Sequence, residues 1–168
     1  MSQETKYLLD ANVLIEAHRR YYAFDIVPSF WQKLIQLATE NKIISIDRIK
    51  DEILKGHKND MLTKWAKSMF NSWFKSTDDP EVFKSYSRVI GWVNDQQYYK
   101  DYAKTEFASV ADSWLIAYAL TYNHTIITHE IFDPNNKKKV LIPVVCEEFN
   151  IPYMNTFDML RSLNTQIG

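Results

Sequence analysis

Short apolar runs recur along this chain, and the stretches between them carry apolar residues at every third or fourth position. The runs occupy residues 6–9, 43–46, 125–128 and 152–154. Each is three or four residues long and mostly apolar, which is typical of strands that a parallel sheet buries on both faces. The pattern therefore predicts short, buried, parallel strands.

The intervening stretches predict helices. Their expected ranges are 11–21, 28–38, 48–54, 60–74, 80–93, 110–122, 142–149 and 156–163. Pro28 and Pro80 suit the first turns of two helices, while Asp47 can cap a third that Gly56 closes. Residues 95–106 are polar and rich in tyrosine, and their pattern gives no assignment.

Strands that alternate with helices in this way indicate a parallel sheet covered on both faces. The predicted fold is α/β: a three-layer α/β/α sandwich with a central, mainly parallel sheet of four to five short strands. We find no internal repeat, low-complexity tract or linker, so residues 1–168 are expected to form a single domain.

Composition narrows the functional classes. The net charge is −1, so any nucleic-acid binding must come from a local basic patch. The single cysteine, Cys146, allows no internal disulfide, which fits a reducing cytoplasm. Neither a signal peptide nor a membrane-spanning segment is expected, and a cytoplasmic location is predicted. No glycine-rich phosphate loop is present, which argues against nucleoside-triphosphate hydrolysis.

Acidic residues stand where a parallel sheet binds its ligands. Asp10 follows the first strand and Glu130 follows the strand at 125–128, while Glu52 and Asp112 lie on helices. Carboxylates that converge repel one another unless a cation compensates them, and Mg²⁺ or Mn²⁺ prefers such oxygen ligands. A divalent-ion site of this kind hydrolyses phosphodiesters.

Each acid also has a purely structural interpretation, and spacing alone leaves both interpretations open. Asp10 can be a helix cap, and Asp112 can be a first-turn acid that interacts with the helix dipole. Glu52 can be a solvent-facing helix residue, and Glu130 can be an ordinary loop residue.

Four short motifs occur in the order found in PIN-domain nucleases. They are YLLDANVLIEA at 7–17, SIDRIKDEI at 45–53, VADSWLIAYAL at 110–120 and IITHE at 126–130. The ordered set resembles that family, and the C-terminal stretch VVCEEFNIPYMNTFDMLRSL is similar to a bacterial and archaeal branch of it.

The resemblance implies a sandwich fold and a metal-dependent endoribonuclease that cleaves RNA with Mg²⁺ or Mn²⁺. It assigns catalytic, metal-binding roles to Asp10, Glu52, Asp112 and Glu130. It also implies that Asn12 orients the Asp10 side chain and that Thr128 supports the site by hydrogen bonding. It further implies that the protein is the toxin of a toxin–antitoxin pair, with a cognate antitoxin protein as its partner. A homodimer is also compatible with the resemblance.

The chain departs from the family pattern at the fourth acid, where the family more often has Asp and this chain has Glu130. Asp133 could substitute for it. Asp51 could compete with Glu52, although the apolar periodicity of that helix favours Glu52.

Two lysine groups are candidates for RNA contact. Lys64 and Lys67 lie in a stretch that interleaves lysines with aromatic residues, which also fits an amphipathic helix whose aromatic side faces the core. Lys137 and Lys138 lie in a loop beyond Glu130, where a solvated loop is the alternative.

Two other functions compete with nuclease activity. A phosphotransfer domain also places Asp after its first strand, but dehalogenase-like members need a second Asp where this chain has Asn12. A non-catalytic PIN-like interaction module is the other alternative, because fold does not fix function.

Overall fold

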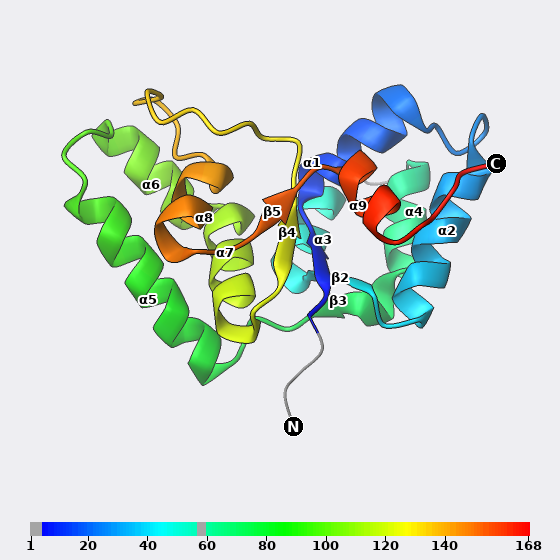
Figure 1. Cartoon of the computed structure of the whole chain (residues 1–168), viewed down its shortest axis with the longest axis horizontal. Coiled ribbons are helices and arrows are strands. Elements are labelled where there is room, and N and C mark those ends of the chain that lie inside the picture. The colour runs from blue at the N-terminus through cyan, green and yellow to red at the C-terminus, as the bar shows by residue number, and fades with distance from the viewer. Residues whose placement is uncertain (1–4, 57–59) are drawn as a thin grey trace.

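A five-stranded parallel sheet forms the centre of the computed structural model, which describes residues 5–56 and 60–168 (Figure 1). The strands are β1 (Tyr7–Leu9), β2 (Ile43–Ile46), β3 (Phe74–Lys75), β4 (Thr125–Ile127) and β5 (Tyr153–Met154). They follow the order β3-β2-β1-β4-β5, and every neighbouring pair is parallel. The predicted α/β class and parallel sheet are confirmed.

Helices cover the sheet on both sides. They are α1 (Ala11–Glu16), which continues as the π-helical turn η1 (Ala17–Tyr21), α2 (Pro28–Thr39), α3 (Asp47–Gly56), α4 (Met61–Ser68), the 3₁₀ turn η2 (Asn71–Trp73), α5 (Pro80–Asp95), α6 (Asp101–Ser109), α7 (Ala111–Tyr122), α8 (Ile142–Phe149) and α9 (Thr156–Ser162). In Figure 1, α5 to α8 lie on one side of the strands and α2, α4 and α9 on the other, which gives the predicted three layers.

The central strands are buried because they carry the apolar runs that predicted them. All four residues of β2 and all three of β4 are buried. The one polar side chain in β2, Ser45, is buried but keeps a hydrogen-bond partner, because its hydroxyl donates to the Leu9 carbonyl oxygen at 2.8 Å. This bond ties β2 to the end of β1, next to Asp10.

The prediction of one helix over residues 60–74 is wrong. Helix α4 ends at Ser68, and β3 begins at Phe74, where the chain pairs with the outer edge of β2 through Ser45 and Phe74. Phe70 is fully buried at the turn between them, while Met69 is 54% exposed. Pairing with a strand distant in sequence and burial of Phe70 outweigh local helical spacing here.

The aromatic residue of α4, Trp65, is part of the core. Trp65 is buried, stacks on Phe70 with ring centroids 4.9 Å apart, and packs edge-on against Trp31. The amphipathic interpretation of this helix is therefore confirmed. Lys64 and Lys67 lie exposed on its outer side.

Within the described residues, none of the helices combines the length and apolar character that a bilayer crossing requires.

Candidate active site

Asp10 is fixed by the end of the central strand. Its backbone N–H donates to the Ile127 carbonyl oxygen at 2.9 Å, which extends the β1–β4 pairing by one residue. Asp10 is also the N-cap residue of α1, but its side chain makes no capping hydrogen bond. Asp10 therefore holds the cap position, but because its side chain makes no capping bond, the carboxylate is available to the pocket beside it.

A buried threonine holds that carboxylate. The Thr128 hydroxyl donates to Asp10 Oδ2 at 2.9 Å, and the Glu130 backbone N–H donates to the Thr128 oxygen at 3.1 Å. Asp10 and Thr128 are each 2% exposed. This chain of bonds joins the ends of β1 and β4, so the sheet itself sets the position of the Asp10 side chain.

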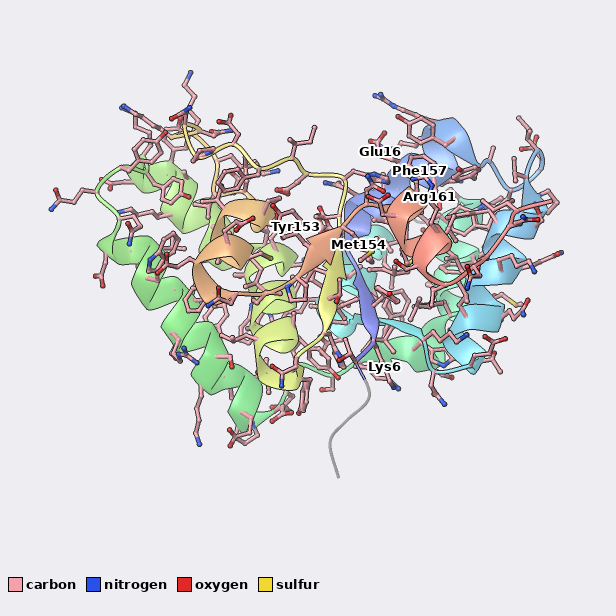
Figure 2. The ribbon with its side chains drawn as sticks, viewed as in Figure 1. Lys6, Glu16, Tyr153, Met154, Phe157 and Arg161 are labelled. Carbon is pink, nitrogen blue, oxygen red and sulfur yellow. The ribbon has the colours of Figure 1, made fainter. Side chains whose placement is uncertain are left out.

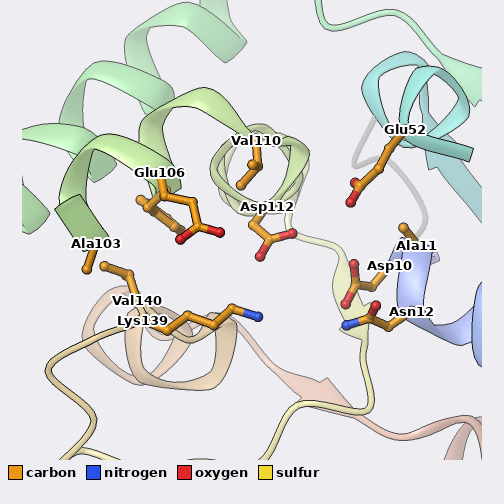
Figure 3. A pocket seen from close by; sticks show the side chains of 11 residues that line it. Asp10, Ala11, Asn12, Glu52, Ala103, Glu106, Val110, Asp112, Lys139 and Val140 are labelled. Carbon is orange, nitrogen blue, oxygen red and sulfur yellow. The ribbon is translucent and has the colours of Figure 1, made fainter. Parts of the chain in front are cut away.

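A pocket of about 110 Å³ opens in front of Asp10. Its lining residues are Asp10, Ala11, Asn12, Glu52, Ala103, Glu106, Phe107, Val110, Asp112, Lys139 and Val140. Figure 3 shows Glu52 reaching in from α3, Asp112 from the start of α7 and Lys139 from the opposite side. The pocket thus brings together Asp10, Glu52 and Asp112, which lie more than forty residues apart in sequence.

Asp10, which is buried, and Asp112, which is half-buried, have strongly raised pKa values. Burial, and after it the charge of Glu130, raises the pKa of Asp10 to about 7, while the hydrogen bond from Thr128 opposes the rise. Loss of hydration, and after it repulsion from Asp10, Glu130 and Glu52, raises the pKa of Asp112 to about 8. A first-turn position favours an ionised acid, so at Asp112 the crowding outweighs the helix dipole.

Glu52, and not its neighbour Asp51, faces the other acids. Both are exposed, but Glu52 lines the acidic pocket and Asp51 does not. Loss of hydration raises the pKa of Glu52, and the ammonium groups of Lys139 and Lys55 partly offset the rise.

Glu130 is not among the residues that line this pocket. Its Oε1 accepts a hydrogen bond at 3.1 Å from the backbone N–H of Ile142, the first residue of α8. Its Oε2 is buried, has no hydrogen-bond partner in the described structure, and lies 3.9 Å from Lys139 Nζ. Glu130 therefore acts on the pocket through its charge, without lining it.

Asp133 does not replace Glu130. It is exposed in the loop after β4, and its Oδ1 accepts a hydrogen bond from the Asn135 backbone N–H at 3.1 Å. Asn12 lines the pocket, but within residues 5–56 and 60–168 no hydrogen bond joins it to Asp10.

The sequence pattern did not single out Glu106 or Lys139, which line this pocket, and the four lysines predicted to contact RNA lie outside it. Glu106 enters from α6, which lies in the stretch that gave no assignment. Lys139 lines the pocket, whereas Lys137 lies over the Tyr98 ring, 5.3 Å from its centroid, and Lys138 is exposed in the loop. Lys64 and Lys67, on α4, do not line it either.

The donor chemistry suits a hard divalent cation, although the ligands are not assembled into a cage. Four carboxylates line the pocket with one ammonium group, and the Glu130 Oε2 oxygen has no donor. Among the described residues, however, no group of three His, Cys, Asp or Glu side chains is close enough to hold a metal ion. The residue types fit Mg²⁺ or Mn²⁺, but the carboxylates stand too far apart in this structure for three of them to bind one ion together.

Residues 7–167 match the family described as "Domain of unknown function (DUF4411)". A search of curated proteins finds no match. Similar solved structures include VapBC2 from Rickettsia felis bound to a promoter DNA fragment (TM-score 0.55, 15% identity, 90% of this chain and 98% of that chain). FitAcB from Neisseria gonorrhoeae matches with a TM-score of 0.52 and 17% identity, over 90% of this chain and 98% of that chain. FitAB bound to the IR36 DNA fragment matches with a TM-score of 0.50 and 18% identity, over 89% of this chain and 94% of that chain. At these identities the likeness shows the fold alone, which is PIN-like.

Proposed function

The chain belongs to the DUF4411 family, and we propose that it is a metal-dependent endoribonuclease. The observation that carries the proposal is the acidic pocket at the carboxyl ends of β1 and β4. Three separate helices and the end of β1 contribute its carboxylates, and burial, together with repulsion between the acids, raises the pKa values of Asp10 and Asp112 to about 7 and about 8. Holding the buried Asp10 and the half-buried Asp112 beside two further acids is unfavourable without a cation, so their convergence points to a bound cation.

In this proposal Asp10, Glu52 and Asp112 hold Mg²⁺ or Mn²⁺, while Glu130 adds negative charge. The bound ion would lower the pKa of a water molecule and offset charge on the phosphate. Hydrolysis then joins the water oxygen to phosphorus and breaks one P–O bond. Glu106, an exposed acid that this proposal leaves free of the ion, is suited to take the water proton, and Lys139 to contact a phosphate oxygen.

RNA as substrate and a toxin role rest on likeness. The ordered motifs at 7–17, 45–53, 110–120 and 126–130 resemble PIN-domain nucleases. The solved neighbours are the VapBC2, FitAcB and FitAB proteins, two of them bound to DNA. We therefore propose that this chain is the toxin of a toxin–antitoxin pair, and that it also forms a homodimer in the cytoplasm.

Exposed apolar side chains support a protein partner. Ile131 and Phe132, in the loop after β4, are 81% and 44% exposed, and Phe157 on α9 is 41% exposed. Phe157 lines one surface hollow with Ile131 and Met154, and Figure 2 labels Met154 on the edge strand β5 and Phe157 on α9. Exposed apolar residues that gather in this way are typical of interaction surfaces.

The direct test is cleavage of a single-stranded RNA by the purified full-length chain. We expect cleavage with Mn²⁺ or Mg²⁺, none with EDTA, and little with a DNA strand of the same sequence. Products are followed by gel electrophoresis. Cleavage that persists in EDTA would overturn the metal requirement, and equal cleavage of the DNA would overturn RNA selectivity.

A non-catalytic module with the same fold is the second candidate. The observation in its favour is that no three acids within the described residues stand as close as metal ligands. It predicts no divalent-ion-dependent cleavage of any RNA. It also predicts that Mn²⁺ binding, measured by calorimetry, does not depend on Asp10 and is the same in the wild type and in Asp10→Asn.

Expression in a bacterial host tests the toxin role. We expect induction of the wild-type chain to arrest growth and induction of Asp10→Asn to leave growth normal, because the variant lacks a central carboxylate of the pocket. Immunoblots check that both proteins accumulate equally. Normal growth with the wild-type chain at that level would contradict a toxin role without bearing on cleavage in vitro.

A further inference from the structure

The acidic pocket continues into a second and larger hollow of about 240 Å³ between α3 and the start of α7. Glu52 and Val110 line both, so the two share a wall. The second hollow differs in chemistry, because Arg48 and Lys55 of α3 and the indole of Trp114 of α7 line it. A chain that crosses the acidic pocket would meet basic and aromatic groups next.

Arg48 is held in a defined position. Its guanidinium lies over the Trp114 ring, 3.9 Å from the centroid, and Trp114 stacks on Tyr86 with a centroid distance of 3.9 Å. Its Nε donates to the Thr77 hydroxyl at 3.0 Å. Thr77 is buried and donates in turn to Asp47 Oδ1 at 2.8 Å. Stacking and the Nε bond together fix the guanidinium plane.

The terminal amino groups of Arg48 remain available. In the part of the chain that the structure describes, no carboxylate forms an ion pair with Arg48, although Asp51 and Glu52 line the same hollow. A guanidinium that is oriented in this way and has free Nη groups suits two parallel hydrogen bonds to a phosphate. Lys55, on the same helix, adds a second positive charge to this hollow.

We propose that this hollow binds the phosphate of the nucleotide next to the cleaved bond, through Arg48 and Lys55. The inference rests on the proposed nuclease function and adds a substrate subsite to it. Continuity with the acidic pocket favours a nucleic-acid chain over an acidic protein segment, because only the former places a phosphate at each of two successive sites.

The test measures RNA binding without cleavage. Every protein carries Asp10→Asn, and a fluorescent single-stranded 12-nucleotide RNA reports the Kd by anisotropy over a range of salt concentrations. We expect Arg48→Gln to weaken binding about ten- to a hundred-fold, because it removes charge-assisted hydrogen bonds. The slope of log K against log salt should fall by about 0.7 for one lost phosphate contact. Lys55→Gln should lower the same slope.

Lys50→Gln is the matched control. Lys50 lies on α3 between the two basic residues, but its Nζ donates to Asn71 at 2.6 Å and it does not line the hollow. Its replacement also removes one positive charge. It should therefore change the Kd and the slope of log K against log salt only by the small amount that losing any surface charge would cause. Thermal melting shows whether Arg48→Gln still folds, and Lys55→Gln keeps the test decisive if it does not.

The outcomes separate the subsite from the nuclease function. RNA binding that neither Arg48→Gln nor Lys55→Gln weakens, or that Lys50→Gln weakens equally, overturns the subsite. Displacement of the RNA by poly-glutamate as readily as by unlabelled RNA also overturns it, in favour of an acidic protein segment. If both variants weaken binding while the chain without Asp10→Asn cleaves nothing, the subsite stands and the proposed chemistry fails.

Discussion

Asp10→Asn is expected to lower divalent-ion-dependent RNA cleavage by at least on the order of 10³-fold while the protein stays folded. The substitution keeps the size of the side chain, and the amide oxygen can still accept the Thr128 hydrogen bond. It removes the negative charge at the position that the sheet fixes most firmly, where the backbone of Asp10 pairs with Ile127. Initial rates of cleavage at saturating Mn²⁺ measure the effect, and circular dichroism checks the fold.

Asp133→Asn is the matched control for this prediction. It makes the same chemical change three residues after Glu130, in an exposed loop outside the pocket. We expect full activity from it. A loss of cleavage in Asp133→Asn would mean that this loop supplies the fourth acid, and normal cleavage by Asp10→Asn would place the reaction elsewhere on the molecule.

The part of the site that the sequence predicts lies on strongly patterned elements. Asp10 stands at the end of an apolar run, and Asp112 opens a helix that is apolar almost throughout, so their positions follow from local structure. The position of Glu52 follows from the apolar periodicity of α3. Ile49 and Ile53 are buried and fix the inner side of this helix, which places Glu52 at the edge that faces the pocket.

The rest depends on packing that no local pattern contains. Glu106 reaches the pocket because Ala103 and Phe107 are buried and orient α6, yet the residues before them are polar and weakly periodic. Lys139 is the lysine of its run that lines the pocket, next to the buried Val140. Strand β3 has two residues and exists through its pairing with β2, a contact that sequence spacing cannot reveal.

Asp112→Asn is expected to stabilise the metal-free protein at pH 8, on the order of 3 kcal/mol, which corresponds to a rise in melting temperature of about 6–12 °C. In the folded protein, burial and repulsion raise the pKa of Asp112 from 3.8 to about 8. Between these values the folded state binds more protons than the unfolded state, so this group's contribution to stability is lost as the pH rises from about 4 to about 8. Within the described residues no hydrogen bond to the Asp112 carboxylate is broken by the change.

Asp101→Asn is the control, since Asp101 is an exposed acid in the first turn of α6 and its replacement should change stability by less than about 1 kcal/mol. Melting in EDTA at pH 5 and pH 8 measures the difference between each variant and the wild type. The advantage of Asp112→Asn should be smaller at pH 5, because Asp112 is then already protonated in the folded wild type. Saturating Mn²⁺ at pH 8 should remove that advantage, because the ion stabilises ionised Asp112 in the wild type and loses a ligand in the variant. A variant no more stable than the wild type at pH 8 would show that these carboxylates are not crowded, and the argument for a bound cation would lose its basis.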